Sequence, residues 1–92
     1  MQFKASCSHI RENIGLFFTI TDISNWNTDD AEQALRASLG QQCGVSPGSW
    51  MWEQQLDGSA IVTFVTPTST PVLCVSDCIR WAGGPYSTSP GV

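Results

Sequence analysis

The chain has few basic residues and little charge of any kind. Only 13% of its 92 residues are charged, the net charge is −4, and the bases are scattered as Lys4, Arg11, Arg36 and Arg80. Proteins that bind nucleic acids or anionic lipids need clustered cations that neutralise phosphate groups. The sequence therefore argues against a nucleic-acid partner and against charge-driven membrane binding.

Long hydrophobic runs are also missing. A membrane-spanning helix needs about 20 consecutive apolar residues, and no segment of this chain approaches that length. Residues 1–15 lack the apolar core of a signal peptide. We therefore expect no transmembrane segment, and we expect a secreted form to be the mature chain, starting elsewhere than at Met1.

Residue types that carry catalysis are scarce. His9 is the only histidine, so any Cys–His or Ser–His–Asp site would have to use it. Asp29 and Asp30 are adjacent, but they lie at the start of a predicted helix, where N-terminal capping accounts for them. No glycine-rich phosphate loop is present. The sequence predicts neither an enzyme nor a cofactor.

The four cysteines, Cys7, Cys43, Cys74 and Cys78, are a high number for a chain of this length. Small secreted domains commonly use disulfides because their cores are modest. Each bridge typically adds about 2–4 kcal/mol by restricting the unfolded chain. We therefore predict a secreted, extracellular protein with two disulfides.

The pairing of these cysteines stays open. Cys74 and Cys78 lie one helical turn apart, and an intact helix holds such side chains parallel rather than facing each other. We expect Cys7 and Cys43 each to pair with Cys74 or Cys78. A zinc site is the alternative, but structural zinc favours Cys-x-x-Cys pairs, which the chain lacks, so we predict no metal.

Three segments indicate β-strands. In residues 15–23, Leu16, Phe18 and Ile20 alternate with Phe17, Thr19 and Thr21, which is the pattern of a half-buried strand. Residues 50–56 and 59–66 flank Leu56-Asp57-Gly58 and predict a hairpin.

The register of this hairpin follows from its loop. A two-residue turn would place Trp50 and Trp52 with Ile61, Thr63 and Val65. A three-residue loop with a left-handed Gly58 gathers the apolar residues on one face, namely Trp50, Trp52, Ala60, Val62 and Phe64. We prefer the second because one-sided burial specifies register. It leaves Met51, Ile61 and Val65 on the outer face.

Two segments predict helices. Residues 28–40 follow a cap at Asn27 or Thr28, carry an apolar stripe and end at Gly40. Residues 71–82 are capped by Thr70, with Pro71 in the first turn, and stop at Gly83. The segment 83–92 is predicted to be mostly loop, with a short edge strand at 86–88.

This order of elements predicts a single domain over residues 1–92 with an α+β fold. Two helices on one face of an antiparallel sheet would form a two-layer α/β sandwich. Right-handed connections would give the split βαβ, ferredoxin-like arrangement. That arrangement places Cys7, Cys43 and the cysteines of the second helix at one end of the sheet, in agreement with the predicted bridges.

The strand at 16–23, the helix at 28–40, the hairpin at 50–66 and the cysteine-bearing helix at 71–82 together resemble small cysteine-rich proteins secreted by fungi. Within that group, the KP-six-type killer toxins and effectors of plant pathogens have the most similar architecture. The resemblance lies in element order and disulfide placement and covers most of the chain. It carries no functional residue over.

The resemblance implies a secreted toxin or virulence effector that binds a host or competitor protein, a cell-wall component or a membrane component. A secreted carbohydrate-binding or inhibitor module is the alternative, and an extracellular hydrolase is a third possibility. Candidate interaction residues are Met51, Ile61, Val65, Trp50 and Trp52. A homodimer through the sheet edge or the outer face is a further expectation.

Overall fold

The computed structural model of the chain describes residues 4–24 and 30–84. Along the chain, its elements are β1 (Lys4–Glu12), β2 (Gly15–Ser24), α1 (Ala31–Gln42), the short 3₁₀ helix η1 (Pro47–Ser49), β3 (Met51–Gln54), β4 (Ala60–Thr66) and α2 (Val72–Trp81). The predicted strand at 15–23, the hairpin and both helices are therefore confirmed, with shifts at their ends.

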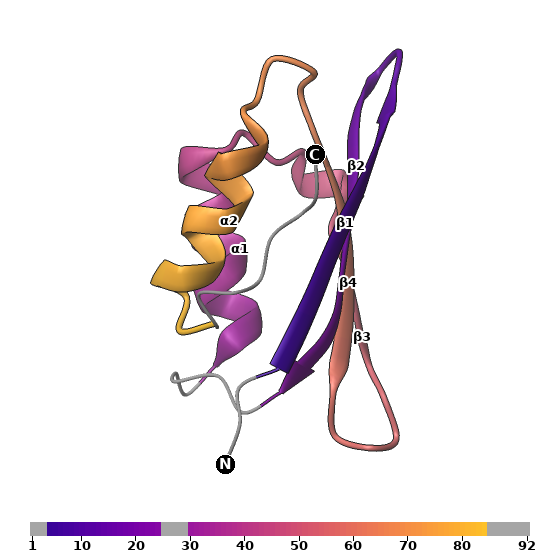
Figure 1. The fold of residues 1–92 in the computed structure, drawn as a ribbon, viewed down its shortest axis with the longest axis vertical. Helices are drawn as coiled ribbons and strands as arrows, with labels where there is room; N and C mark the ends of the chain where they lie inside the picture. The colour runs from indigo at the N-terminus through magenta and orange to yellow at the C-terminus, as the bar shows by residue number, and fades with distance from the viewer. Residues whose placement is uncertain (1–3, 25–29, 85–92) are drawn as a thin grey trace.

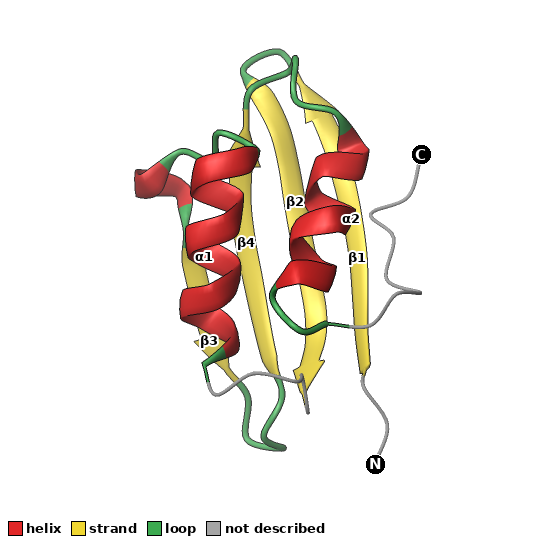
Figure 2. Cartoon of the chain, turned by 90° about the vertical axis from the view of Figure 1, so that its left-hand side faces the viewer, coloured by secondary structure: helices red, strands yellow, loops and turns green. Residues whose placement is uncertain are grey.

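The four strands form one antiparallel sheet in the order β1-β2-β4-β3. Both helices lie on the same side of this sheet (Figure 1). Figure 2 shows α1 in front of β3 and β4, and α2 in front of β1 and β2. The predicted α+β class with an antiparallel sheet and two helices is thus correct. Within residues 4–24 and 30–84, no helix covers the opposite face of the sheet.

Strand β1 was not predicted. Its inward positions, Cys7, His9 and Arg11, alternate with Ser6, Ser8 and Ile10, so neither face of the segment is continuously apolar. Because two strands precede α1, the order of described elements is ββαββα rather than the βαββαβ of a ferredoxin-like fold. The ferredoxin-like arrangement is not confirmed, and the predicted edge strand at 86–88 lies outside the described residues.

The hydrophobic core lies between the sheet and the helices. Strands β2 and β4 supply alternate residues to it, and helices α1 and α2 close it from the other side. Its least exposed large side chains are Leu16, Phe18, Ile20, Leu35, Leu39, Val62, Phe64, Val75 and Ile79. The rings of Phe18 and Phe64, which are opposite each other on β2 and β4, stack with centroids 5.4 Å apart. The stacked rings connect β2 and β4, the two central strands of the sheet.

The structure confirms the preferred register of the β3–β4 hairpin. Trp52 is opposite Val62, and Gln54 is opposite Ala60. Gly58 has a φ of 92°, and its N–H donates to the Gln55 carbonyl oxygen at 3.2 Å. A left-handed glycine closing a three-residue loop is the geometry that the apolar pattern required.

A bulge near the end of β2 keeps the strand in register with the core. Asp22 has a φ of 58°, and the pairing with β4 shifts between Ile20 and Ile23. Aspartate tolerates this left-handed conformation better than most residues. The extra residue turns Ile23 inward, which explains why Ile20 and Ile23 are both buried although they are three positions apart.

The ends of α1 differ from those predicted. The N-cap is Asp30, whose side chain accepts a hydrogen bond from the Gln33 N–H at 3.1 Å. The predicted caps at 27 and 28 lie outside the described residues. Gly40 does not end the helix, which continues to Gln42 with Cys43 as its C-cap. Gly40 therefore lies inside the last turn of α1. This turn is closed by a hydrogen bond from the Cys43 N–H to the Leu39 carbonyl oxygen.

The start of α2 also differs from the prediction. Pro71 occupies the N-cap, and none of the described side chains caps the helix. The Thr70 hydroxyl instead donates to the Cys43 carbonyl oxygen at 3.0 Å, which connects the loop before α2 to the end of α1. At the other end Gly83 has a φ of 92°, as a helix-stopping glycine requires.

At Gly15, where β2 approaches β4, we expect that no larger residue fits without a loss of stability. A Cβ atom at this position would lie 2.6 Å from the Thr66 carbonyl oxygen and 2.8 Å from Val65 Cγ1. We expect Gly15→Ala to lower the free energy of unfolding by about 1–3 kcal/mol. The matched control is Gly40→Ala, which meets nothing within 4 Å and should stabilise the helix by about 0.5–1 kcal/mol. Chemical denaturation measures both, and equal effects of the two substitutions would contradict the close approach.

Candidate functional site

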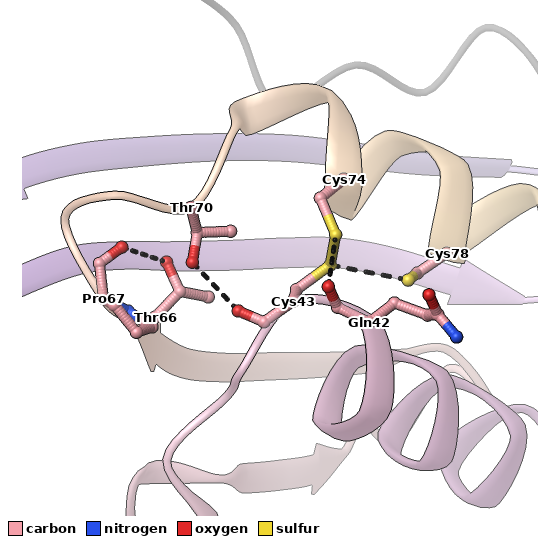
Figure 3. The surroundings of a disulfide bond; sticks show 7 residues. All are labelled: Gln42, Cys43, Thr66, Pro67, Thr70, Cys74 and Cys78. Atoms are coloured by element: carbon pink, nitrogen blue, oxygen red, sulfur yellow. Dashed lines mark hydrogen bonds between the residues drawn. A yellow bond between two sulfur atoms is a disulfide. The ribbon is translucent and has the colours of Figure 1, made fainter.

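Three of the four cysteines meet where α1 ends and α2 packs against it. Cys43, the C-cap of α1, forms a disulfide with Cys74 of α2, with Cα atoms 5.9 Å apart. Cys78 lies one turn further along α2, and its Sγ is 3.5 Å from Cys43 Sγ. Figure 3 shows Cys43 facing both α2 cysteines. One of the predicted bridges from Cys43 to α2 is therefore present.

The prediction of two disulfides is confirmed for one bridge only. Cys7 and Cys78 are thiols in this structure. Cys43 is within reach of both α2 cysteines but can bond to one, and its bond to Cys74 leaves Cys78 as a buried thiol. Cys7 lies on β1 opposite Ile20 and contributes to the same hydrophobic core.

Burial changes the acidity of both thiols. It raises the pKa of the Cys7 thiol from 9.0 to about 12. Burial, with a smaller contribution from the negative charge of Asp77, raises the pKa of the Cys78 thiol from 9.0 to about 11. Both groups are therefore protonated near neutral pH, where thiols are weak nucleophiles.

A second candidate site is the outer face of the sheet, which is opposite the helices. Its central row runs across three strands, because Ile10 of β1 is opposite Phe17 of β2, and Phe17 is opposite Val65 of β4. In the next row, Thr63 of β4 is opposite Met51 of β3. Met51 and Ile10 are 67% and 65% exposed, so this apolar surface is open to a partner.

A hollow of about 290 Å³ lies beside Met51 and Phe17, and the residues of the outer face that line it are Phe17, Thr19, Met51, Thr63 and Val65. We refer to Ile10 and these five residues as the outer apolar face. Ile61, the third predicted residue, is half-buried further along β4, opposite Glu53. The sequence pattern found Met51 and Val65 but missed Ile10 and Phe17, although the alternation of 15–23 already placed Phe17 opposite the core.

The predicted tryptophans lie on the helix side of the sheet. Trp50 and Trp52 are half-buried and pack against the core. The Trp50 ring stacks with Trp52 and with Phe64, with centroids 6.5 and 5.7 Å apart. Its Nε1–H donates to a Glu32 carboxylate oxygen of α1 at 3.2 Å. Both tryptophans thus pack the start of the hairpin against the core, and Trp50 connects it to α1.

His9 also has a packing role. It is half-buried on the inner side of β1, and its ring stacks on Phe18 with centroids 5.4 Å apart. The cysteine nearest in sequence, Cys7, faces the same side of the strand. The contact with Phe18 explains how a polar residue occupies an inward position on this edge strand.

No protein-family model matches the chain, and neither curated proteins nor solved structures include a significant match. Within the described residues, no helix has the length and apolar character needed to cross a membrane.

The raised pKa values predict that stability depends on alkaline pH. Because the thiols titrate near 9.0 when unfolded and at about 11 and 12 when folded, deprotonation begins in the unfolded chain first. The stabilising contribution is complete below pH 9 and is lost as pH rises toward 12. We expect the free energy of unfolding of the single-disulfide form to fall between pH 9 and pH 11. Denaturant unfolding should show a shallower fall for Cys7→Ser and Cys78→Ala, and superimposable pH profiles would contradict the assignment.

Proposed function

We propose that the protein is a secreted, disulfide-stabilised protein of the killer-toxin or effector type, which acts by binding a host or competitor surface. The observation that carries the proposal is the outer apolar face, an open apolar surface on a small chain that is otherwise acidic. Exposed apolar patches commonly mark interaction sites.

The composition of the outer apolar face limits the partner. Its members carry methyl, aromatic, thioether or hydroxyl groups, and Glu53 lies at its border, opposite Ile61. A partner surface rich in phosphate or carboxylate would gain no ion pair from these groups. A protein or cell-wall surface with apolar and hydroxyl groups would gain both burial and hydrogen bonds. A second copy of the chain meets the same requirement.

The sheet that carries the outer apolar face also supports binding. Four antiparallel strands support the outer apolar face, and the stacked core beneath β2 and β4 fixes their register. The side chains are thus held in place before a partner arrives, which lowers the entropy lost on binding.

Oxidation of the two remaining thiols is part of this proposal. In an oxidising compartment Cys7 and Cys78 are the pair left once Cys43 has bonded to Cys74. Both residues belong to the layer between the sheet and α2. A Cys7–Cys78 bridge would connect β1 to α2 and complete the two predicted disulfides.

The role of the outer apolar face can be tested with a pair of matched substitutions. Met51 is 67% exposed on this face, whereas Leu73 is 72% exposed on α2. We expect Met51→Glu to abolish retention of the labelled protein on intact fungal or plant cells and any growth inhibition or plant response. Leu73→Glu should leave these activities unchanged.

Both substitutions replace exposed side chains, so circular dichroism and melting temperature should stay near those of the wild type. Equal loss of binding by both variants, or full binding by Met51→Glu, would contradict an outer-face site. Size-exclusion chromatography of the same variants shows whether the partner is a second copy. Retention on chitin or glucan that survives Met51→Glu would favour a carbohydrate-binding module.

The oxidation state is tested by intact mass with alkylation under denaturing conditions. We expect the protein from an oxidising compartment to take up no alkyl groups before reduction and four after it, since two bridges hold all four cysteines. Uptake of two groups before reduction would show that the protein keeps a single disulfide, which would contradict the proposed Cys7–Cys78 bridge. Uptake of four would rule out an oxidised, secreted form.

A further inference from the structure

The cysteine cluster gathers three sulfur atoms into a small volume. The Sγ atoms of Cys43, Cys74 and Cys78 all lie within 4.8 Å of one another. Cys43 comes from the end of α1, while Cys74 and Cys78 lie one turn apart on the same face of α2. Figure 3 shows the three side chains converging from the two helices. The approach of Cys78 to Cys43 is not imposed by a bond, because Cys78 is a thiol in this structure.

The spacing of the sulfurs suits a metal ion bound by thiolates. With zinc–sulfur bonds of about 2.3 Å, tetrahedral ligands lie about 3.8 Å apart. Cys43 Sγ and Cys78 Sγ are already 3.5 Å apart, and the other separations are no larger than 4.8 Å. With the Cys43–Cys74 bond reduced, the spacing that zinc requires would follow from rotation of these two side chains, since their Cα atoms are 5.9 Å apart.

The surroundings favour a defined site. Cys43 and Cys78 are 3% and 0% exposed, so the backbone around them is fixed by the core. The Thr70 hydroxyl holds the Cys43 carbonyl and thereby the end of α1. Cys74 is half-exposed, and the Gln42 carbonyl oxygen lies 3.2 Å from its Sγ. The cluster is therefore reached from the Cys74 side, where the Gln42 carbonyl oxygen contacts a cluster sulfur.

We propose that the reduced chain binds one thiophilic cation, Zn(II) or Cu(I), through Cys43, Cys74 and Cys78. The disulfide and the metal site exclude each other, because both use the sulfurs of Cys43 and Cys74. Two molecules of a low-molecular-weight thiol supply the two electrons and two protons that convert the disulfide into two thiols, and are themselves oxidised to one disulfide. Binding of the cation then displaces one proton from each of the three thiols.

The sequence argued against a metal because it lacks Cys-x-x-Cys pairs. In the structure, two ligands would come from Cys74 and Cys78 on successive turns of α2. The third would come from Cys43 at the end of α1. Soft thiolate ligands select Cu(I) and Zn(II) over hard cations. This inference is independent of the binding function, because it concerns the reduced chain.

Cobalt(II) titration of the reduced protein without oxygen tests the proposal. We expect thiolate-to-metal charge-transfer bands that saturate at one cobalt per chain and disappear on addition of zinc. Cys78→Ser and Cys74→Ser should each weaken binding by about 100-fold, since each removes one of three charged ligands. Cys7→Ser is the matched control and should bind as the wild type does, because Cys7 is outside the sulfur cluster.

Folding is checked separately from binding. The melting temperature of the reduced wild type and of Cys7→Ser should rise with added zinc, because a ligand that binds the folded state stabilises it. The Cys78→Ala variant should show little rise. Absence of charge-transfer bands in the reduced wild type, equal weakening by Cys7→Ser, or unchanged binding in the oxidised protein would each overturn the proposal.

Discussion

The burial of one face of the sheet is the constraint on which the rest of the structure depends. Strands β2 and β4 place alternate side chains beneath two helices, and the stacked rings of Phe18 and Phe64 hold the strands in register. A slip of one residue would expose this whole row and bury the opposite one. Both described helices lie on that one side, so the outer apolar face lies on the side of the sheet that no described helix covers.

The junction between the helices gives Cys43 several roles at once. It caps α1, bonds to Cys74, approaches the Cys78 thiol and accepts a hydrogen bond from Thr70. The junction therefore stabilises the helix layer in the oxidised chain and supplies the proposed metal ligands in the reduced chain. The two proposed sites lie on opposite sides of the sheet, so each can be altered without touching the other.

The sequence predicted those elements whose buried residues recur at regular spacing. It did not predict elements whose position depends on contacts with other parts of the chain. The alternation of Leu16, Phe18 and Ile20 was sufficient to predict a strand. The register of the hairpin followed from a left-handed Gly58 together with burial of one face. Strand β1 was missed because its inward residues include Cys7 and His9, which are accommodated by packing on neighbours. The outer apolar face was found in part, since Phe17 and Ile10 become neighbours only after β1 pairs with β2.

By itself, the sequence determined the α+β class, the hairpin register and the set of cysteines available for bridges, because these follow from local periodicity and turn chemistry. Only the tertiary structure decided that Cys43 bonds to Cys74, that Thr70 holds the end of α1 and that Gly40 lies within a helix. These outcomes depend on which atoms meet when α1 packs against α2. Residues far apart in the chain set that geometry, and no local pattern records it.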